Sequence, residues 1–214
     1  MDALWSRGVS NDQIADFAIG YIDGELPSDV EYPSEFRKWS GDGSKLEDSF
    51  VLPLTNWVGE TKGIQFRSVK QEIKGYMDFF TTRSEPVLFG LAQAAVHVWR
   101  TRSITTVEGA FDLFPVQRAV PGVVATITGK INNQFLRSIR RVADTIYIFY
   151  DDDPLGRKAS WEFKKEHGGE LNVRIIEYPS GVLRWDGKRV KDPGELWESW
   201  GDDRLTAFLQ SQVG

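Results

Sequence analysis

Three consecutive carboxylates, Asp151, Asp152 and Asp153, follow an apolar run that begins at Ile146 and ends at Tyr150. Such a run is typical of a strand buried on both faces, so the acids are expected where that strand ends. Crowded carboxylates repel one another and need a cation nearby. The sequence has no cysteine and only two histidines, so a metal at this point must be held by oxygen ligands, which suits Mg²⁺ or Mn²⁺.

Two other segments place acids where predicted elements meet. Glu108 follows a short β-branched run, with Asp112 four residues later, and Asp192 lies between Lys191 and Pro193. Because the ends of parallel strands lie together, these acids can share one crevice, which could hold two divalent cations or one cation and a general base. Acids are also common at helix N-caps and turns, so each of them alone fits a structural role equally well.

The elements that must position these acids follow Ser103, where strand and helix patterns alternate. Strands are predicted at 104–109, 123–128, 145–151 and 172–179, and helices at 110–119, 131–143 and 156–168. This order predicts an α/β fold with a mainly parallel sheet and helices on both faces. Pro115 argues that the first of these helices starts late or is distorted; if Asp112 lies near its N-cap, Pro115 falls in the first turn, where its missing N–H matters little. Residues 191–212 predict a loop followed by two short helices.

The first hundred residues predict a mixed α/β unit. Ser10 is the expected N-cap of a short helix that ends at Gly20. Residues 50–54 and 62–69 predict a hairpin, and residues 89–100 a helix. Arg67, on the hairpin, fits a ligand contact and a solvated strand face about equally well. Residues 23–49, rich in Gly, Pro, Ser and Asp, predict a loop.

Charge is distributed unevenly along the chain. The net charge of −5 argues weakly against a nucleic-acid partner, but residues 113–143 contain no acid at all. The same stretch contains five of the cations that could bind a polyanion, namely Arg118, Lys130, Arg137, Arg140 and Arg141. No apolar run is long enough for a membrane span and no signal peptide is evident, so we expect a soluble, cytoplasmic protein.

Three short blocks carry a resemblance to a known fold. The series VEGAFD, YDDDPLGRKA and KDP resembles the Toprim fold, and among Toprim proteins it looks most like bacterial-type (DnaG-like) DNA primases. Two earlier blocks, SRGVSNDQIADFAIGY and FVLPLTNWVGETKGIQFRS, resemble the start of the primase RNA-polymerase core. The resemblance covers nearly the whole chain. It divides the chain into an N-terminal mixed α/β subdomain (1–102), a Toprim-like domain (103–187) and a C-terminal loop with short helices (188–214).

The resemblance implies a metal-dependent nucleotidyltransferase that makes short RNA primers on single-stranded DNA from NTPs. It implies that Glu108 and Asp112 act in catalysis and that Mg²⁺ or Mn²⁺ is bound by Asp151, Asp153, Asp192 and Glu108. Nucleotide or nucleic acid would be contacted by Arg67, Lys130, Arg157, Arg137, Arg140 and Arg141. Asp152 occupies the variable position between the two metal ligands and is expected to face solvent.

The chain departs from the family pattern at Gly194, where a further acid is usual; that ligand is lost or replaced by Glu195. A basic block and a zinc-binding module are also missing. We therefore expect a minimal core of a phage or plasmid type that works with a separate zinc-binding or helicase subunit. Two alternatives stay open, a metal-dependent Toprim nuclease and a non-catalytic nucleic-acid-binding Toprim module.

Overall fold

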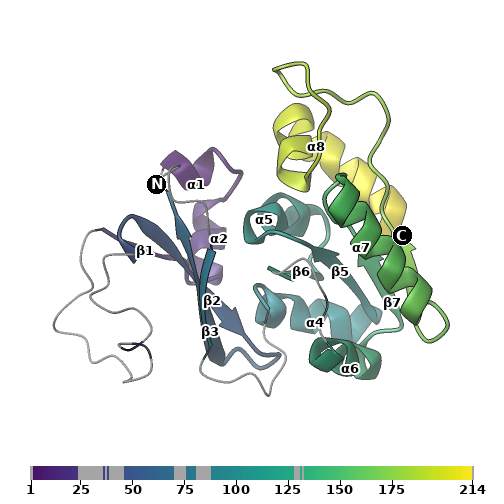
Figure 1. Ribbon diagram of the computed structural model, residues 1–214, viewed down its shortest axis with the longest axis horizontal. Helices are drawn as coiled ribbons and strands as arrows, with labels where there is room; N and C mark the ends of the chain where they lie inside the picture. Colours follow the sequence, from purple (N-terminus) through teal and green to yellow (C-terminus); the bar gives the residue numbers. More distant parts are fainter. Residues whose placement is uncertain are drawn as a thin grey trace.

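The chain forms two four-stranded sheets that lie side by side (Figure 1). The computed structural model describes residues 2–23, 36, 38, 46–69, 76–80, 88–127, 131 and 133–213. Lys130 and most of the loop predicted at 23–49 fall outside these residues. Among the helices of the described part, none is long and apolar enough to cross a bilayer.

The first sheet is antiparallel, with the strand order β1-β2-β3-β4. Its strands are β1 (Gly20–Ile22), β2 (Ser49–Thr55), β3 (Thr61–Ser68) and β4 (Tyr76–Phe80). The predicted hairpin is confirmed as β2 and β3, whose register pairs Phe50 with Arg67.

Two short helices, α1 (Asp2–Trp5) and α2 (Asn11–Asp16), precede this sheet. The Ser10 N-cap is confirmed, because Ser10 Oγ accepts a hydrogen bond from the Gln13 amide while Gln13 Oε1 accepts one from the Ser10 amide, both at 3.1 Å. α2 ends at Asp16, earlier than the predicted end at Gly20.

The second sheet is parallel, with the order β6-β5-β7-β8, and confirms the predicted α/β fold class. Its strands are β5 (Ser103–Val107), β6 (Val123–Ala125), β7 (Thr145–Ile148) and β8 (Asn172–Ile175). The helices around it are α4 (Leu91–Thr101), α5 (Ala110–Ala119), α6 (Asn133–Val142), α7 (Pro154–His167) and α8 (Pro193–Val213).

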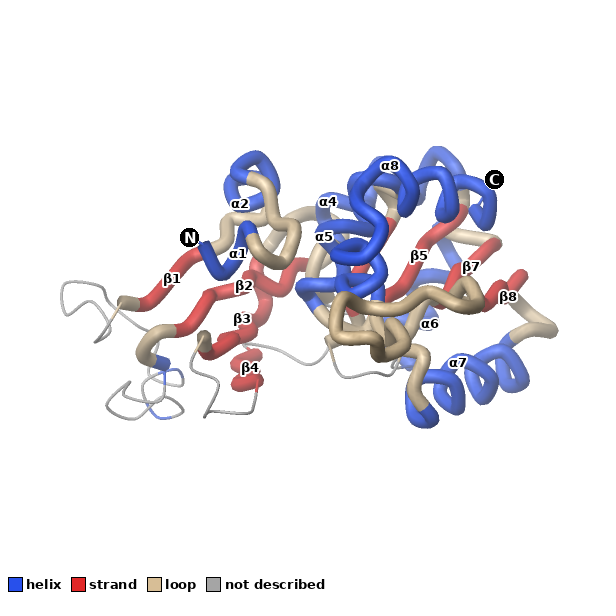
Figure 2. The backbone as a smooth tube through the Cα atoms, turned by 90° about the horizontal axis from the view of Figure 1, so that it is seen from above, coloured by secondary structure: helices blue, strands red, loops and turns tan. Residues whose placement is uncertain are grey.

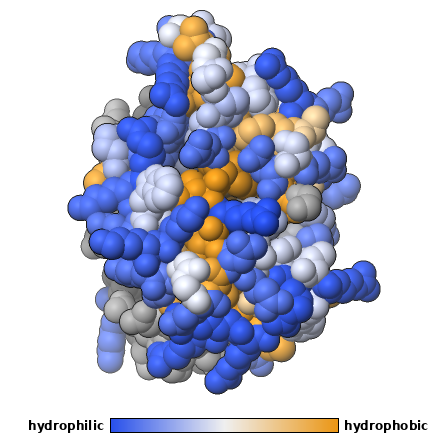
Figure 3. Space-filling model, turned by 90° about the vertical axis from the view of Figure 1, so that its right-hand side faces the viewer, coloured by the Kyte–Doolittle hydropathy of each residue, from blue (hydrophilic) through white to orange (hydrophobic). Residues whose placement is uncertain are grey.

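Alternate residues of each strand supply two cores, one on each face of the parallel sheet. Val107 and Tyr147 pack with α5 and α8, and the same core continues to α1 and the antiparallel sheet. Ile104 and Ile146 pack with α4, α6 and α7 on the other face. Figure 2 shows α5 and α8 on one side of the strands and α6 and α7 on the other. β8 forms the outer edge, and Figure 3, which faces this end, shows a hydrophobic band between hydrophilic side chains.

Two local predictions were wrong in detail, and a third was right. Pro115 lies well inside α5, because this helix already begins at Ala110 rather than near Asp112. β7 ends at Ile148, although Phe149 and Tyr150 beyond it remain buried. The prediction of two short C-terminal helices is confirmed, because α8 consists of two helices separated by a kink at Gly201, whose φ of 72° is unstrained only for glycine.

Candidate active site

The carboxyl ends of β5 and β7 bring Glu108 and Asp151 together. Thr106 and Ile148 are register partners in these neighbouring parallel strands, so the residues that follow them share one edge of the sheet. The Asp151 amide donates a hydrogen bond to Glu108 Oε1 at 3.3 Å. The predicted convergence of these two acids is therefore present in the structure.

Asp153 is fixed by the first turn of α7. Its Oδ1 accepts hydrogen bonds from the amides of Leu155 and Gly156, both at 2.8 Å, as an N-cap does. Gly156 is needed for this close approach, because a Cβ there would lie 2.2 Å from the Asp151 carbonyl oxygen and 2.7 Å from Glu108 Oε1. A glycine thus lets α7 begin directly against the two acids.

Asp112 and Asp192 meet at the start of α8. Asp112, in the first turn of α5, accepts a hydrogen bond from the Gly194 amide at 3.2 Å, and Asp192 accepts one from the Glu195 amide at 2.7 Å. A Cβ on Gly194 would lie 3.3 Å from Asp112 Oδ1 and 3.4 Å from Asp192 Oδ1. Glu195 itself forms an ion pair with Arg184, so its carboxylate is already engaged.

Burial and mutual repulsion raise the pKa of four acids at this edge. Burial is the largest cause for Asp151, whose pKa rises to about 7, and the charges of Glu108, Asp192 and Asp153 add to the effect. Burial also raises the pKa of Glu108, of Asp192 and, most strongly, of Asp112. Such a group is costly to keep ionised, and a bound cation would remove the cost.

Asp152 does not face solvent as expected. Its side chain is only 10% exposed and forms ion pairs of 2.7 Å with Arg157 and with Arg189. Its amide also donates to the Lys191 carbonyl at 2.6 Å. The prediction failed because Arg189 lies far along the chain, so the sequence around Asp152 gives no sign of it. Arg157, expected to contact nucleotide, is engaged in this ion pair.

A cleft of about 510 Å³ opens beside the acids, between the two sheets. Its lining includes the acids Asp112, Asp151 and Asp192 and the arginines Arg7 and Arg67. The guanidinium groups of these arginines lie over the ring of Phe111, at 5.1 and 5.8 Å from its centroid. The cleft is further lined by Ser6, Gly109, Arg184, Lys191, Gly194, Glu195 and Glu198.

Sequence reasoning placed Arg67 at this cleft but missed Arg7, Phe111, Arg184 and Lys191. Signals for three of them were available, since Lys191 directly precedes Asp192, and Arg7 and Phe111 lie in primase-like blocks. Phe111 lies within the block VEGAFD, next to Asp112, whereas Arg184 has no such local signal. The place of Arg184 depends on tertiary packing.

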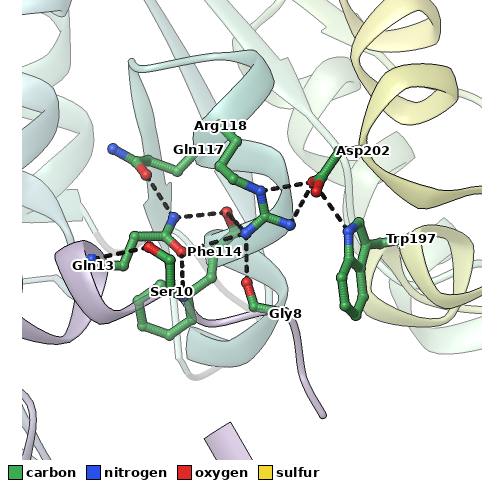
Figure 4. Close-up of polar contacts among 8 residues, drawn as sticks. All are labelled: Gly8, Ser10, Gln13, Phe114, Gln117, Arg118, Trp197 and Asp202. Atoms are coloured by element: carbon green, nitrogen blue, oxygen red, sulfur yellow. Dashed lines mark hydrogen bonds and ion pairs between the residues drawn. The ribbon is translucent and has the colours of Figure 1, made fainter. Parts of the chain in front are cut away.

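Arg118 holds the helices behind the cleft together (Figure 4). Its guanidinium donates to the Gly8 carbonyl and pairs with Asp202 at 2.6 Å, while Gln13 donates to the Phe114 carbonyl at 2.9 Å. The segment that presents Arg7 is thereby tied to α5 and α8. Arg118 was predicted as part of a polyanion-binding stretch, whereas the structure uses its charge for these contacts.

The three arginines that the same stretch contributes to α6 do not gather at the acids. α6 ends at Val142, just before β7 begins, so Arg140 and Arg141 lie at the amino edge of the sheet. Arg140 forms an ion pair with Glu170 there. Arg137 precedes Arg140 by about one turn on the same helix.

The donor set at the carboxyl edge suits a hard divalent cation. Asp151 Oδ1 is buried and has no hydrogen-bond partner among the residues described. Within that part of the chain no three His, Cys, Asp or Glu side chains already converge as one ligand set. This arrangement fits Mg²⁺ or Mn²⁺, because such ions commonly take one or two carboxylates and complete their shell with water and substrate phosphates.

The chain is similar to known DNA primases in sequence and in fold. No family model matches the chain. It is 22% identical to the DNA primase of Thermotoga maritima over 98% of its own length and spans 39% of that primase. The RNA polymerase domain of Mycobacterium tuberculosis primase DnaG superposes with a TM-score of 0.77 at 18% identity, covering 98% of this chain and 74% of that one.

A DnaG primase catalytic domain solved with bound ssDNA also superposes, with a TM-score of 0.72 at 18% identity over 98% of this chain and 70% of that one. The matches extend over both sheets. This chain is related in sequence to bacterial-type DNA primases and has the fold of the DnaG catalytic core.

Proposed function

We propose that this chain is a primase catalytic core that makes short RNA primers on single-stranded DNA by nucleotidyl transfer from NTPs. The observation that carries the proposal is the convergence of acids from three separate segments on one cleft, which Arg7 and Arg67 also line. A cleft lined by both acids and cations suits a reaction between a metal-bound triphosphate and a polyanionic strand. The similarity to primases over 98% of the chain supports the same conclusion.

In this proposal Asp151, Asp153, Asp192 and Glu108 hold Mg²⁺ or Mn²⁺. Such ions, when bound, neutralise the triphosphate and favour departure of pyrophosphate. Glu108, whose pKa burial raises, is suited to accept the proton of the attacking 3′-hydroxyl. Asp112 supports this group from α5, where it is held by the Gly194 amide.

Arg7 and Arg67 are proposed to bind the triphosphate or the template phosphates. Their guanidinium groups are kept in place over Phe111, so the positive charge is presented to the cleft at a fixed position. The role first assigned to Arg157 is less well supported, because Arg157 pairs with Asp152. A separate zinc-binding or helicase subunit remains part of the proposal as a partner for initiation.

The test is primer synthesis on an oligonucleotide template with each NTP and Mg²⁺ or Mn²⁺, with and without a supplied primer. The wild type should form short oligoribonucleotides, and Glu108→Gln and Asp151→Asn should each reduce synthesis by roughly 100-fold or more. Asp144→Asn, which removes a carboxylate at the opposite edge of the same sheet, is the matched control and should retain synthesis. No synthesis by the wild type, even by primer extension, would contradict the proposal.

The same reactions distinguish the alternatives. Metal-dependent cleavage of labelled DNA or RNA without NTPs would indicate a nuclease that uses the same acids. Binding of ssDNA without metal binding by calorimetry would indicate a non-catalytic module.

A further inference from the structure

The connection between β8 and α8 contains a small hairpin, residues 182–190, which we call the basic hairpin. The Val190 amide donates to the Val182 carbonyl at 3.4 Å, and the Arg184 amide donates to the Lys188 carbonyl at 2.7 Å. In Figure 1 it is the yellow-green loop that rises above α8. Its backbone hydrogen bonds give this loop a defined shape.

Two ion pairs attach the basic hairpin beside the acids of the cleft. Arg184 pairs with Glu195 at the start of α8, and Arg189 pairs with Asp152 at 2.7 Å. Asp152 lies between two of the proposed metal ligands, and Glu195 lies three residues after another. The base of the basic hairpin therefore keeps a fixed position relative to the carboxyl edge of the sheet.

The tip presents an aromatic ring and positive charge to solvent. Trp185 is 89% exposed, which makes it the most exposed of the large hydrophobic residues among those described, and Leu183 is 57% exposed. Residues 182–191 contain four cations and one acid, a local net charge of +3 in a chain whose net charge is −5. Lys188 at the tip has a side chain that is 78% exposed and lies 3.8 Å from Asp186, an exposed and loose ion pair that leaves the ammonium group accessible to a phosphate.

An exposed tryptophan next to cations is the combination that binds single-stranded nucleic acid. Bases stack on the ring whatever their sequence, while lysine and arginine neutralise the phosphates. Arg184 and Lys191, at the two ends of this segment, also line the cleft. A strand that enters the cleft from this side would pass the tip before it reaches the acids.

We propose that the basic hairpin binds single-stranded DNA, with Trp185 stacking on a base and Lys188 contacting the backbone. The inference rests on the proposed function only in taking this DNA to be the template. Binding of DNA at the hairpin does not itself require catalysis.

The test measures the Kd of the full chain for a fluorescently labelled oligothymidine by anisotropy, over a series of salt concentrations. Trp185→Ala should weaken binding by about 10-fold, as expected for the loss of one stacked base. Trp99→Ala is the matched control, because Trp99 is 51% exposed on α4 and lies near the amino edge of the sheet. Both side chains are largely in solvent, so both variants should fold, which thermal unfolding would verify.

Lys188→Ala should weaken binding by a few-fold and lower the slope of log Kd against log salt by about one. Lys165→Ala, in the last turn of α7, is its control and should leave the slope unchanged. A blunt duplex of the same length offers no unstacked base, so its binding should be insensitive to Trp185→Ala.

An unchanged Kd for Trp185→Ala, or no ssDNA binding by the wild type, would overturn the proposal; the first result would point to a protein partner for the exposed tryptophan. The outcome is separate from that of the proposed function. Wild-type primer synthesis with an unaffected Trp185→Ala Kd would refute the hairpin alone, whereas a weakened Kd without any synthesis would support the hairpin and refute the polymerase.

Discussion

Acids at the two edges of the parallel sheet have opposite electrostatic environments. At the amino edge, Asp144 accepts hydrogen bonds from Arg102 at 2.6 and 2.8 Å, which lower its pKa. At the carboxyl edge, Asp151 is partly buried among other acids and its pKa is raised to about 7. At the amino edge, an arginine of the protein neutralises the carboxylate. At the carboxyl edge, the crowded carboxylates need a bound cation to neutralise them.

This difference separates acids that serve the fold from acids that serve a ligand. A paired surface acid is explained by its partner, whereas a buried, crowded acid lowers stability and is typical of a functional site. Asp152 shows that sequence proximity is a poor guide to the distinction. It lies within the acidic turn, yet two arginines neutralise it, and so it belongs with the structural acids.

The largest expected effect comes from closing the space at the carboxyl edge. Gly156→Ala should lower the free energy of unfolding by about 3 kcal/mol and abolish primer synthesis, because its Cβ would overlap the Asp151 carbonyl and push α7 away from Glu108. Gly169→Ala is the control, since nothing lies within 4 Å of a Cβ there. Urea unfolding and primer extension measure both effects. Equal stability of the two variants would show that α7 does not pack this tightly.

A second prediction concerns metal binding. Mg²⁺ or Mn²⁺ at about 100 times its Kd should stabilise the protein by about 2.7 kcal/mol, which corresponds to a rise in Tm of roughly 5–10 °C. Asp151→Asn should remove most of this rise, and Asp144→Asn should retain it. Thermal unfolding with and without EDTA is the measurement. A rise of the same size in both variants would place the ions elsewhere.

The stability of the metal-free protein should depend on pH because acids are crowded around Asp151. The pKa of Asp151 in the folded state lies above its value in the unfolded chain, so between these two values the folded protein binds a proton that the unfolded chain does not. The free energy of unfolding therefore falls as pH rises from about 4 to 7. Asp151→Asn should make the decrease in stability smaller and should raise the free energy of unfolding by about 1 kcal/mol at pH 8. This value is reduced because the group is partly solvated. At pH 4 the two proteins should be equal. A variant less stable than the wild type at pH 8 would contradict the assignment.

The sequence was sufficient for the features that local patterns determine. The apolar run before Asp151 and the alternation of strands and helices predicted the parallel sheet, and the Ser10 N-cap needed only neighbouring residues. The convergence of Glu108 and Asp151 followed from strand order alone.

The predictions that failed concern residues whose contact partners are distant in sequence. The ion pair of Asp152 with Arg189 and the contacts of Arg118 with Gly8 and Asp202 arise only after the elements pack. The exposed tip at Trp185 gave no periodic signal, because a short hairpin with a glycine turn resembles an ordinary loop. The roles of the site residues and the three domain boundaries stay predictions.

The smallest expected effect concerns Asp144, the paired acid at the amino edge of the sheet. Hydrogen bonds from Arg102 lower the pKa of Asp144, so its stabilisation is present at neutral pH and is lost as pH falls through the folded-state pKa. Asp144→Asn should therefore lower the Tm at pH 7 by only about 1 °C, since this pair is solvent-exposed, and the difference should shrink at low pH and in high salt. The sign is opposite to that expected for Asp151→Asn, although both changes remove one carboxylate from the same sheet. If scanning calorimetry gave both substitutions the same sign at pH 7–8, the two edges would not differ in the way that their geometry indicates, and the acidic cluster would have to be regarded as structural.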